Sequence, residues 1–138
     1  MKISARVNNS EGQHHVTLTT NDISHSIVIP PCPSGFGSSA NGGELLFLAL
    51  ATCYCNDIYR EAAKRNIKVE KVEVEVSGDF GVEGEGAKNV TYRAKVHAKG
   101  TEAEIHALME HTDTVAEIQN TLRTGVDIKL SGIEVLAL

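Results

Sequence analysis

The sequence lacks the clustered basic residues that bind nucleic acid or anionic lipid. Its 138 residues carry 13 Lys and Arg against 18 Asp and Glu, which gives a formal net charge of −5. No run of Lys and Arg is longer than the pair Lys64 and Arg65. Polyanionic surfaces attract dense positive charge, so neither nucleic acid nor a membrane surface is expected as a partner.

Long apolar runs are missing as well. The longest, residues 45–55, is about half of the ~20 residues that a membrane-spanning helix needs. The first residues alternate polar and apolar side chains, and no apolar core is followed by a small-residue cleavage site. We therefore expect a cytoplasmic protein without a membrane-spanning segment.

Cysteine is scarce and odd in number: Cys32, Cys53 and Cys55. Together with the expected cytoplasmic location, this count does not suggest a disulfide framework, because the cytosol keeps thiols reduced. On a helix, Cys53 and Cys55 lie about 200° apart, too far around to pair with each other. Two interpretations stay open for each thiol, a reactive nucleophile or a small buried hydrophobe.

Other catalytic and metal-binding patterns are missing. No histidine falls in the HExxH spacing or in a zinc-finger spacing, and no serine has the context of a nucleophile elbow. The Gly-Phe-Gly at residues 35–37 lacks the third glycine and the βαβ setting of a dinucleotide-binding loop. We expect no metal ion and no cofactor.

What the sequence does contain is a pattern of strands separated by two helices. Hairpins with helices between them indicate an α+β fold with antiparallel sheets, and the length fits a single domain, residues 1–138. The alternation and the 3.6-residue periodicity predict strands at 2–8, 15–20, 25–29, 67–80, 89–98 and 126–136, and helices from about 41 to 66 and from 101 to about 125.

The first predicted helix follows a loop rich in Pro, Gly and Ser, residues 30–43. Loops of this length are uncommon inside compact domains and tend to be functional. Asn41 is the predicted N-cap, and Glu44 lies in the first turn, where negative charge suits the helix dipole. The first half of the helix is apolar on nearly all sides, which predicts that a second subunit covers part of it.

Two segments resemble the OsmC/Ohr family of osmotically inducible and organic hydroperoxide resistance proteins. Residues 41–53 resemble that family's Asn-Pro-Glu-Glu-Leu-Leu, apolar helix, then Ala-x-Cys, and residues 120–126 resemble its later Asn-x-Leu-Arg helix end. The resemblance implies antiparallel sheets packed around a long buried central helix, with a second amphipathic helix. It also implies an intertwined homodimer with the active site at the subunit interface.

Members of that family reduce organic hydroperoxides with a peroxidatic cysteine, a resolving cysteine and an Arg/Glu pair. By resemblance, Cys53 takes the peroxidatic position. The family's glutamate falls on Gly43, its arginine on Gln13 and its resolving cysteine on Ala116, with Glu117 in place of the next proline. Most of the family's catalytic positions are therefore changed.

Three hypotheses remain. The first is a thiol-dependent hydroperoxide reductase of altered type, with Cys53 as nucleophile, Glu44 in support and either Cys32 or an external thiol as the resolving group. The second is a family member that has lost peroxidase chemistry and binds a small apolar or thiol-reactive ligand in the dimer-interface pocket. The third is a structural dimer module.

Overall fold

The computed structural model describes residues 1–138 and divides them into two compact units, residues 1–46 and 47–138. The single-domain organisation stays a prediction. None of the helices combines the length and the apolar character needed to cross a membrane.

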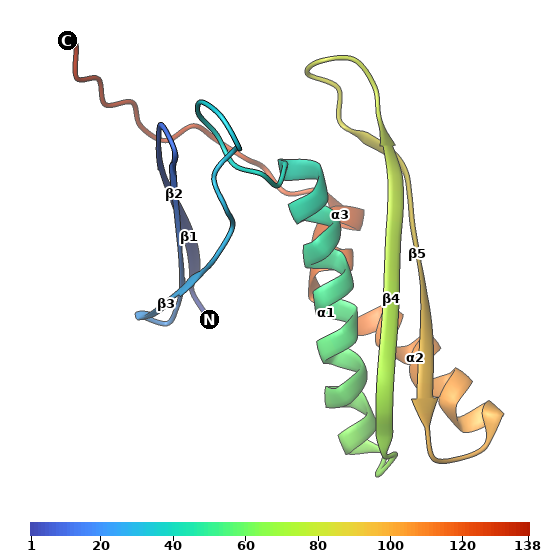
Figure 1. Cartoon of the computed structure of the whole chain (residues 1–138). Helices are drawn as coiled ribbons and strands as arrows, with labels where there is room; N and C mark the ends of the chain where they lie inside the picture. Colours follow the sequence, from blue (N-terminus) through green and yellow to red (C-terminus); the bar gives the residue numbers. More distant parts are fainter. The chain divides into compact units, whose positions relative to one another are not determined.

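The first unit contains a three-stranded antiparallel meander in the order β1 (Ile3–Ser10), β2 (Gln13–Thr20) and β3 (Ile23–Ile27), shown in blue in Figure 1. Asn21 and Asp22, both with positive φ (47° and 66°), form the two-residue turn between β2 and β3. The predicted opening meander is confirmed.

The loop after β3 is ordered by its own backbone. Pro31 and Ser38 form an isolated antiparallel bridge, and the N–H of Cys32 donates to the carbonyl oxygen of Gly37 at 3.0 Å. The side chain of Asn9 bonds to the N–H and the carbonyl of Gly37, at 3.0 and 3.1 Å. Cys32 is therefore fixed within a closed loop.

The helix α1 (Gly42–Lys64) begins where the sequence predicts. Asn41 Oδ1 accepts from the N–H of Glu44 at 2.8 Å, and Glu44 Oε1 accepts from the N–H of Asn41 at 2.9 Å. These reciprocal bonds satisfy two N–H groups that a helix start otherwise leaves free. The first half of the helix is only partly covered within this chain, and Leu48 is 59% exposed.

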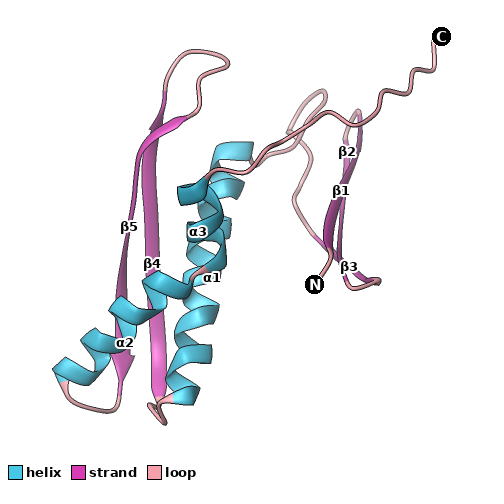
Figure 2. Ribbon diagram, turned by 180° about the vertical axis from the view of Figure 1, so that it is seen from behind, coloured by secondary structure: helices cyan, strands magenta, loops and turns pink.

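The second unit is built on a hairpin of two long strands, β4 (Val69–Phe80) and β5 (Ala87–Ala98). Alternation puts the apolar side chains of both strands on one face, and α1 and α2 (Glu102–Val115) cover that face (Figure 2). The buried core consists of Tyr54, Ile58, Ala62 and Leu108. The α+β class and the two predicted long strands are confirmed.

The second amphipathic helix was expected to run unbroken to Gly125, and this expectation was wrong. The chain leaves the helix at Ala116 (φ −71°, ψ 110°) and starts again as α3 (Glu117–Thr124). Two threonines in the last turns of α2 bond back to backbone carbonyls, Thr112 Oγ1 to Leu108 and Thr114 Oγ1 to His111. Such bonds slightly destabilise a helix and often bend it, which is consistent with a helix end at this point.

The final strand predicted at residues 126–136 is not formed. The chain after Gly125 has no regular secondary structure, and its large apolar side chains are exposed, with Ile128 at 95% and Leu130 at 82%. A strand needs a neighbour to pair its backbone N–H and C=O groups, and alternation alone does not supply one. The prediction of a strand at residues 126–136 was therefore wrong for this chain.

Candidate functional site

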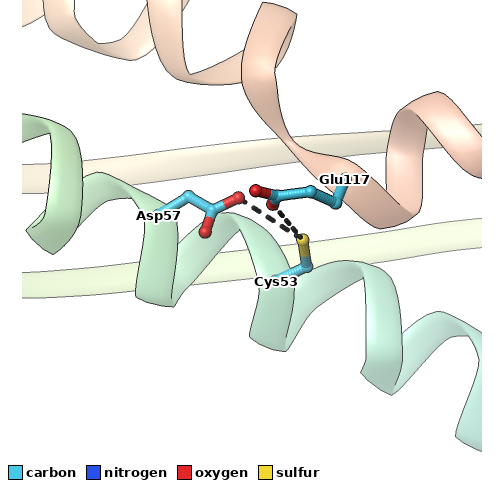
Figure 3. A group of neighbouring side chains, drawn as sticks. All are labelled: Cys53, Asp57 and Glu117. Carbon is cyan, nitrogen blue, oxygen red and sulfur yellow. Dashed lines mark hydrogen bonds between the residues drawn. The ribbon is translucent and has the colours of Figure 1, made fainter. Parts of the chain in front are cut away.

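The thiol of Cys53 lies between two carboxylates. Its Sγ donates to Asp57 Oδ2 at 3.4 Å and lies 3.9 Å from Glu117 Oε2 (Figure 3). Asp57 is four residues further along α1 and therefore on the same face of that helix, whereas Glu117 comes from the first turn of α3. Two helices thus bring one thiol and two carboxylates together.

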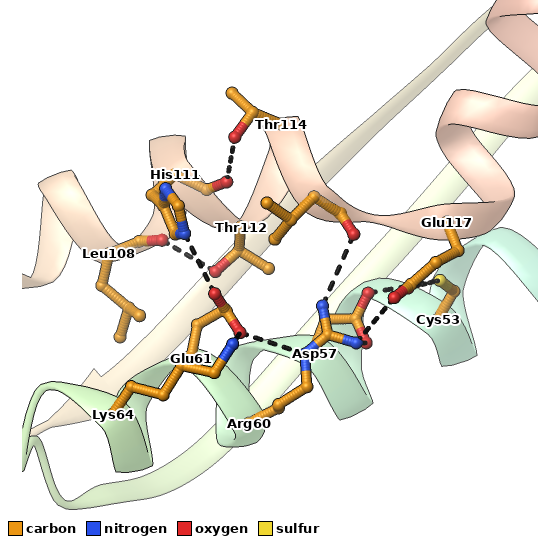
Figure 4. A network of polar contacts seen from close by, with 11 residues as sticks. Cys53, Asp57, Arg60, Glu61, Lys64, Leu108, His111, Thr112, Thr114 and Glu117 are labelled. Carbon is orange, nitrogen blue, oxygen red and sulfur yellow. Dashed lines mark hydrogen bonds and ion pairs between the residues drawn. The ribbon is translucent and has the colours of Figure 1, made fainter.

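A single guanidinium joins these carboxylates. Arg60 Nη1 lies 3.1 Å from Asp57 Oδ1 and 2.8 Å from Glu117 Oε1, while Arg60 Nε lies 3.0 Å from Glu61 Oε2 (Figure 4). The planar guanidinium presents five N–H donors in a fixed arrangement, so it can serve several oxygens at once. Arg60 is the cation closest to the Cys53 end of this network.

Glu61 is the most enclosed carboxylate of the network, with a side chain that is 4% exposed. Besides Arg60 it is bonded by Lys64 Nζ at 2.7 Å and by His111 Nε2 of α2 at 3.0 Å. The hydrogen bonds from Lys64, Arg60 and His111 lower the pKa of Glu61 to about 2. This end of the network therefore holds its negative charge firmly.

Polar side chains of α3 bond to α1 and α2. Gln119, buried to 3% exposure, donates from Nε2 to the carbonyl oxygen of Leu50 in α1 at 3.0 Å. Arg123 Nη2 pairs with Asp113 Oδ1 at 2.6 Å, which ties α3 to the end of α2. The Gln119 bond holds the first turn of α3, which carries Glu117, against α1, and the Arg123 pair holds the last turn.

Burial raises the pKa of the Cys53 thiol, and the negative charges of Asp57 and Glu117 raise it further. The backbone of Ile118, in the first turn of α3, acts in the opposite direction and favours the thiolate. Burial also raises the pKa of Asp57, as does its hydrogen bond with Glu117. A carboxylate with a raised pKa is a stronger base for the neighbouring thiol proton.

The pKa of Glu117 is lowered, first by its own backbone N–H and then by the bond from Arg60, against the effect of burial. Of the two neighbouring carboxyl groups, Glu117 therefore keeps its negative charge, and Asp57 is the one that takes up a proton more readily. The site can accept the Cys53 proton at Asp57 and return it later.

The same three side chains offer donor atoms suited to a divalent cation. Cys53 Sγ and one carboxylate oxygen each of Asp57 and Glu117 all lie within 4.8 Å of one another. The guanidinium of Arg60 already contacts both carboxylates, so a metal ion would have to displace it. We assign no metal ligands here.

The family model described as OsmC-like protein matches residues 35–131. The chain belongs to the OsmC-like family. No curated protein matches the sequence. The match of the family model confirms the family that the two sequence segments suggested.

Solved structures of OsmC-like proteins share the fold. An OsmC-like protein from Mycoplasma pneumoniae is 20% identical, with a TM-score of 0.59 over 88% of this chain and 86% of its own. An OsmC-like protein of unknown function from Vibrio cholerae is 18% identical, with a TM-score of 0.63 over 88% and 94%. An organic hydroperoxide resistance protein from Legionella pneumophila is 24% identical, with a TM-score of 0.56 over 94% of each chain.

In this OsmC-like chain the predicted site residues belong to different units: Cys32 and Glu44 lie in residues 1–46, and Cys53 lies in residues 47–138. Cys53 has its contacts in the second unit, with Asp57 and Glu117. Glu44, nine residues earlier on α1, bonds to Asn41 in the helix cap, and its support of Cys53 stays a prediction. Cys32 lies in the closed loop of the first unit, and its role as a resolving thiol stays a prediction.

Asp57, Arg60 and Glu61 were not identified from the sequence as site residues. One signal was available, because Cys53 and Asp57 are spaced i and i+4 on a helix and so share a face. Glu117 was noted only as a departure from the proline of the OsmC-like pattern. Its contact with Cys53 depends on the break at Ala116, which the periodicity did not predict.

Proposed function

We propose that this OsmC-like protein reduces small organic hydroperoxides with Cys53 as the nucleophile. The observation that carries the proposal is the thiol of Cys53 donating to Asp57, a buried carboxylate that Arg60 also contacts. Structural neighbours named organic hydroperoxide resistance proteins, from Legionella pneumophila and Bacillus subtilis, support the same chemistry. The family resemblance, which places Cys53 at the peroxidatic position, is a further support.

The reaction needs a thiolate, and Asp57 is placed to generate it. Asp57 accepts the proton of Cys53, and the sulfur attacks the terminal oxygen of the hydroperoxide. The O–O bond breaks, Cys53 becomes a sulfenic acid, and the leaving alkoxide takes the proton from Asp57 to depart as an alcohol. The sulfur is oxidised by two electrons, and the hydroperoxide is reduced by two.

A second thiol returns Cys53 to its starting state. Attack of this thiol on the sulfenic acid forms a disulfide and releases water, and a further thiol then reduces the disulfide. Ala116, at the family's resolving position, carries no thiol, so we propose Cys32 or an external thiol reductant. The Cys32→Ser variant decides between them, because a peroxide-induced intramolecular disulfide that persists in this variant excludes Cys32.

Sulfenic acid formation tests the proposed function. The protein is treated with micromolar cumene hydroperoxide, and oxidised Cys53 is trapped with dimedone and quantified by mass spectrometry. We expect Cys53 to be consumed, with no reaction in Cys53→Ser and normal reaction in Cys55→Ser, which removes a half-buried thiol of the same helix. A Cys53 that survives micromolar peroxide would exclude the enzymatic function.

We further propose that the protein acts as a homodimer in the cytoplasm. Apolar side chains exposed on α1 and after Gly125, such as Leu48 and Leu130, support a partner subunit, since burying them is favourable. A nucleophilic thiol also needs a reducing compartment. Sedimentation equilibrium tests the dimer, and a monomer at micromolar concentration would exclude it.

A second candidate function is the binding of a small apolar ligand without peroxide chemistry. The raised pKa of Cys53 favours it, because a protonated thiol is a poor nucleophile. A groove of about 650 Å³ between β5 and α2, lined by Val96, Ile105 and Met109 among others, offers apolar surface within one chain. Ligand binding by a Cys53→Ser variant, together with peroxide-resistant Cys53 in the native protein, would favour this function.

A further inference from the structure

Glu61 is a buried carboxylate for which the proposed reaction has no direct use. Removing an ionised carboxylate from water is costly unless partners compensate for the lost hydration. Glu61 has three such partners, Arg60, Lys64 and His111, at 3.0, 2.7 and 3.0 Å (Figure 4). Two cationic side chains and an imidazole nitrogen around one buried carboxylate indicate a specific role.

Only one of the three partners reaches the Cys53 end of the network. Arg60 bonds to Glu61 through Nε and to Asp57 and Glu117 through Nη1, whereas its Nη2 donates to the carbonyl oxygen of Val115 at 3.4 Å. The contact at Nε fixes one edge of the planar group. The opposite edge then faces the two carboxylates beside Cys53.

Arg60 needs this support because its own side chain is 38% exposed and Glu117 is 62% exposed. Ion pairs between exposed side chains are weak, since ordering two long side chains costs conformational entropy and water screens the charges. A buried anchor of fixed geometry reduces the freedom that Arg60 must lose. Glu61 is such an anchor on the Nε side.

We propose that Glu61 is the positioning residue of this site: it orients the Arg60 guanidinium so that Nη1 contacts both Asp57 and Glu117 next to Cys53. The functional meaning of this inference rests on the proposed chemistry of Cys53. The groups facing Cys53 are Asp57 from its own helix, with Glu117 and the Ile118 backbone from α3. Arg60 acts on the thiol by offsetting the charge of the two carboxylates.

The test is the pH midpoint of Cys53 alkylation by iodoacetamide, measured in a Cys32→Ser, Cys55→Ser background. In Glu61→Gln, Arg60 loses its anchor and neutralises the carboxylates less, so the midpoint is expected to rise by about 0.5 pH unit or more. Alkylation below the midpoint slows by about threefold, because a one-unit shift corresponds to a tenfold change in the thiolate ratio. An unchanged or lowered midpoint would overturn the proposal.

The direction in which the alkylation midpoint shifts distinguishes a positioning role of Glu61 from a direct effect of its charge on Cys53. Glu61→Gln removes a negative charge, which by direct Coulomb interaction would lower the midpoint of a nearby thiol rather than raise it. Glu110→Gln, on the exposed face of α2, removes the same charge without contacting Arg60 and serves as the matched control. An equal upward shift in the control would overturn the proposal.

The partners of Glu61 allow a second measurement. In an Arg60→Gln background the Glu61→Gln substitution should cause no further shift, because the residue through which it acts is gone. If Glu61→Gln does not fold, Glu61→Asp is measured instead, because it keeps the buried charge but has a shorter side chain. The pH midpoint of Cys53 alkylation is again expected to rise, and an unchanged midpoint would overturn the proposal. Alkylation does not involve peroxide, so a failure of the proposed reductase activity would be distinguishable from a failure of this inference.

Discussion

Arg60 lies between two parts of the polar network around α1, the Cys53 half and the Glu61 half, in which Asp57 and Glu61 have pKa values shifted in opposite directions. On one side Asp57 and Glu117 surround a thiol, and the pKa values of Cys53 and Asp57 are raised. On the other side Lys64 and His111 surround Glu61, whose pKa is lowered to about 2. The same helix therefore disfavours negative charge at one end of the network and holds it at the other.

The difference follows first from burial, which raises the pKa of Cys53 and Asp57, and then from the hydrogen-bond donors around Glu61, which lower its pKa. The Cys53 half has no cation of its own and shares Arg60, whereas the Glu61 half has the ammonium of Lys64 and the imidazole nitrogen of His111 in addition. A carboxyl group with a raised pKa accepts a proton more readily than one with a lowered pKa, which favours Asp57 over Glu61 as a proton acceptor. We infer that the Cys53 half is suited to chemistry and the Glu61 half to support.

The largest expected effect comes from Asp57→Asn. If Asp57 accepts the thiol proton, the rate of Cys53 oxidation by cumene hydroperoxide at pH 7 should fall about 10²-fold, in the usual range for loss of a general base. The measurement is the rate of sulfenic acid formation by stopped-flow dimedone trapping. A faster reaction would contradict this role, because it would mean that Asp57 only repels the thiolate and that its removal helps ionisation.

Acid denaturation should distinguish the two halves by the sign of their effect. Glu61 has a folded pKa of about 2 against a usual value of 4.5, so its contribution to the free energy of unfolding is complete above pH 4.5 and is lost as the pH falls toward 2. Asp57 has a raised pKa, so its ionisation opposes folding as the pH rises above 3.8.

Urea unfolding between pH 2 and 6 measures both contributions. Glu61→Gln should flatten the loss of unfolding free energy between pH 4.5 and 2, and Asp57→Asn should remove a decrease that the native protein shows just above pH 3.8. Glu110→Gln removes an exposed carboxylate of α2 that lies outside this network, and this control should keep both features. Identical curves for Glu61→Gln and the native protein would contradict the assignment.

Hydrophobic periodicity predicted most of the fold because it reports which face of an element is buried. The alternation of Val72, Val74 and Val76 predicted β4, and Asn41 as N-cap, with Glu44 in the first turn, predicted the start of α1. The same kind of alternation after Gly125 indicated a strand that this chain does not pair. Periodicity shows which side chains are apolar on one face but not which other segment packs against that face.

The candidate site was harder to predict because it depends on a tertiary contact. Cys53 was identified by its resemblance to the family's cysteine. Asp57 could have been identified by its spacing of four residues from Cys53. Glu117 reaches the thiol only because the chain breaks at Ala116 and α3 is tied back to α1 by Gln119. No local pattern of the sequence specifies that approach.

Glu117→Gln should produce the smallest effect and the most direct test of the charge balance around Cys53. The substitution removes one negative charge near the sulfur and frees Arg60 for Asp57, so the pKa of Cys53 should fall and iodoacetamide alkylation at pH 7 should quicken by about two- to threefold. The effect is modest because the Glu117 side chain is 62% exposed and water screens its charge. The acceleration should be smaller in 0.5 M NaCl. Slower alkylation in Glu117→Gln would instead mean that Glu117 stabilises the thiolate, and the proposed difference between the two halves of the network would be wrong.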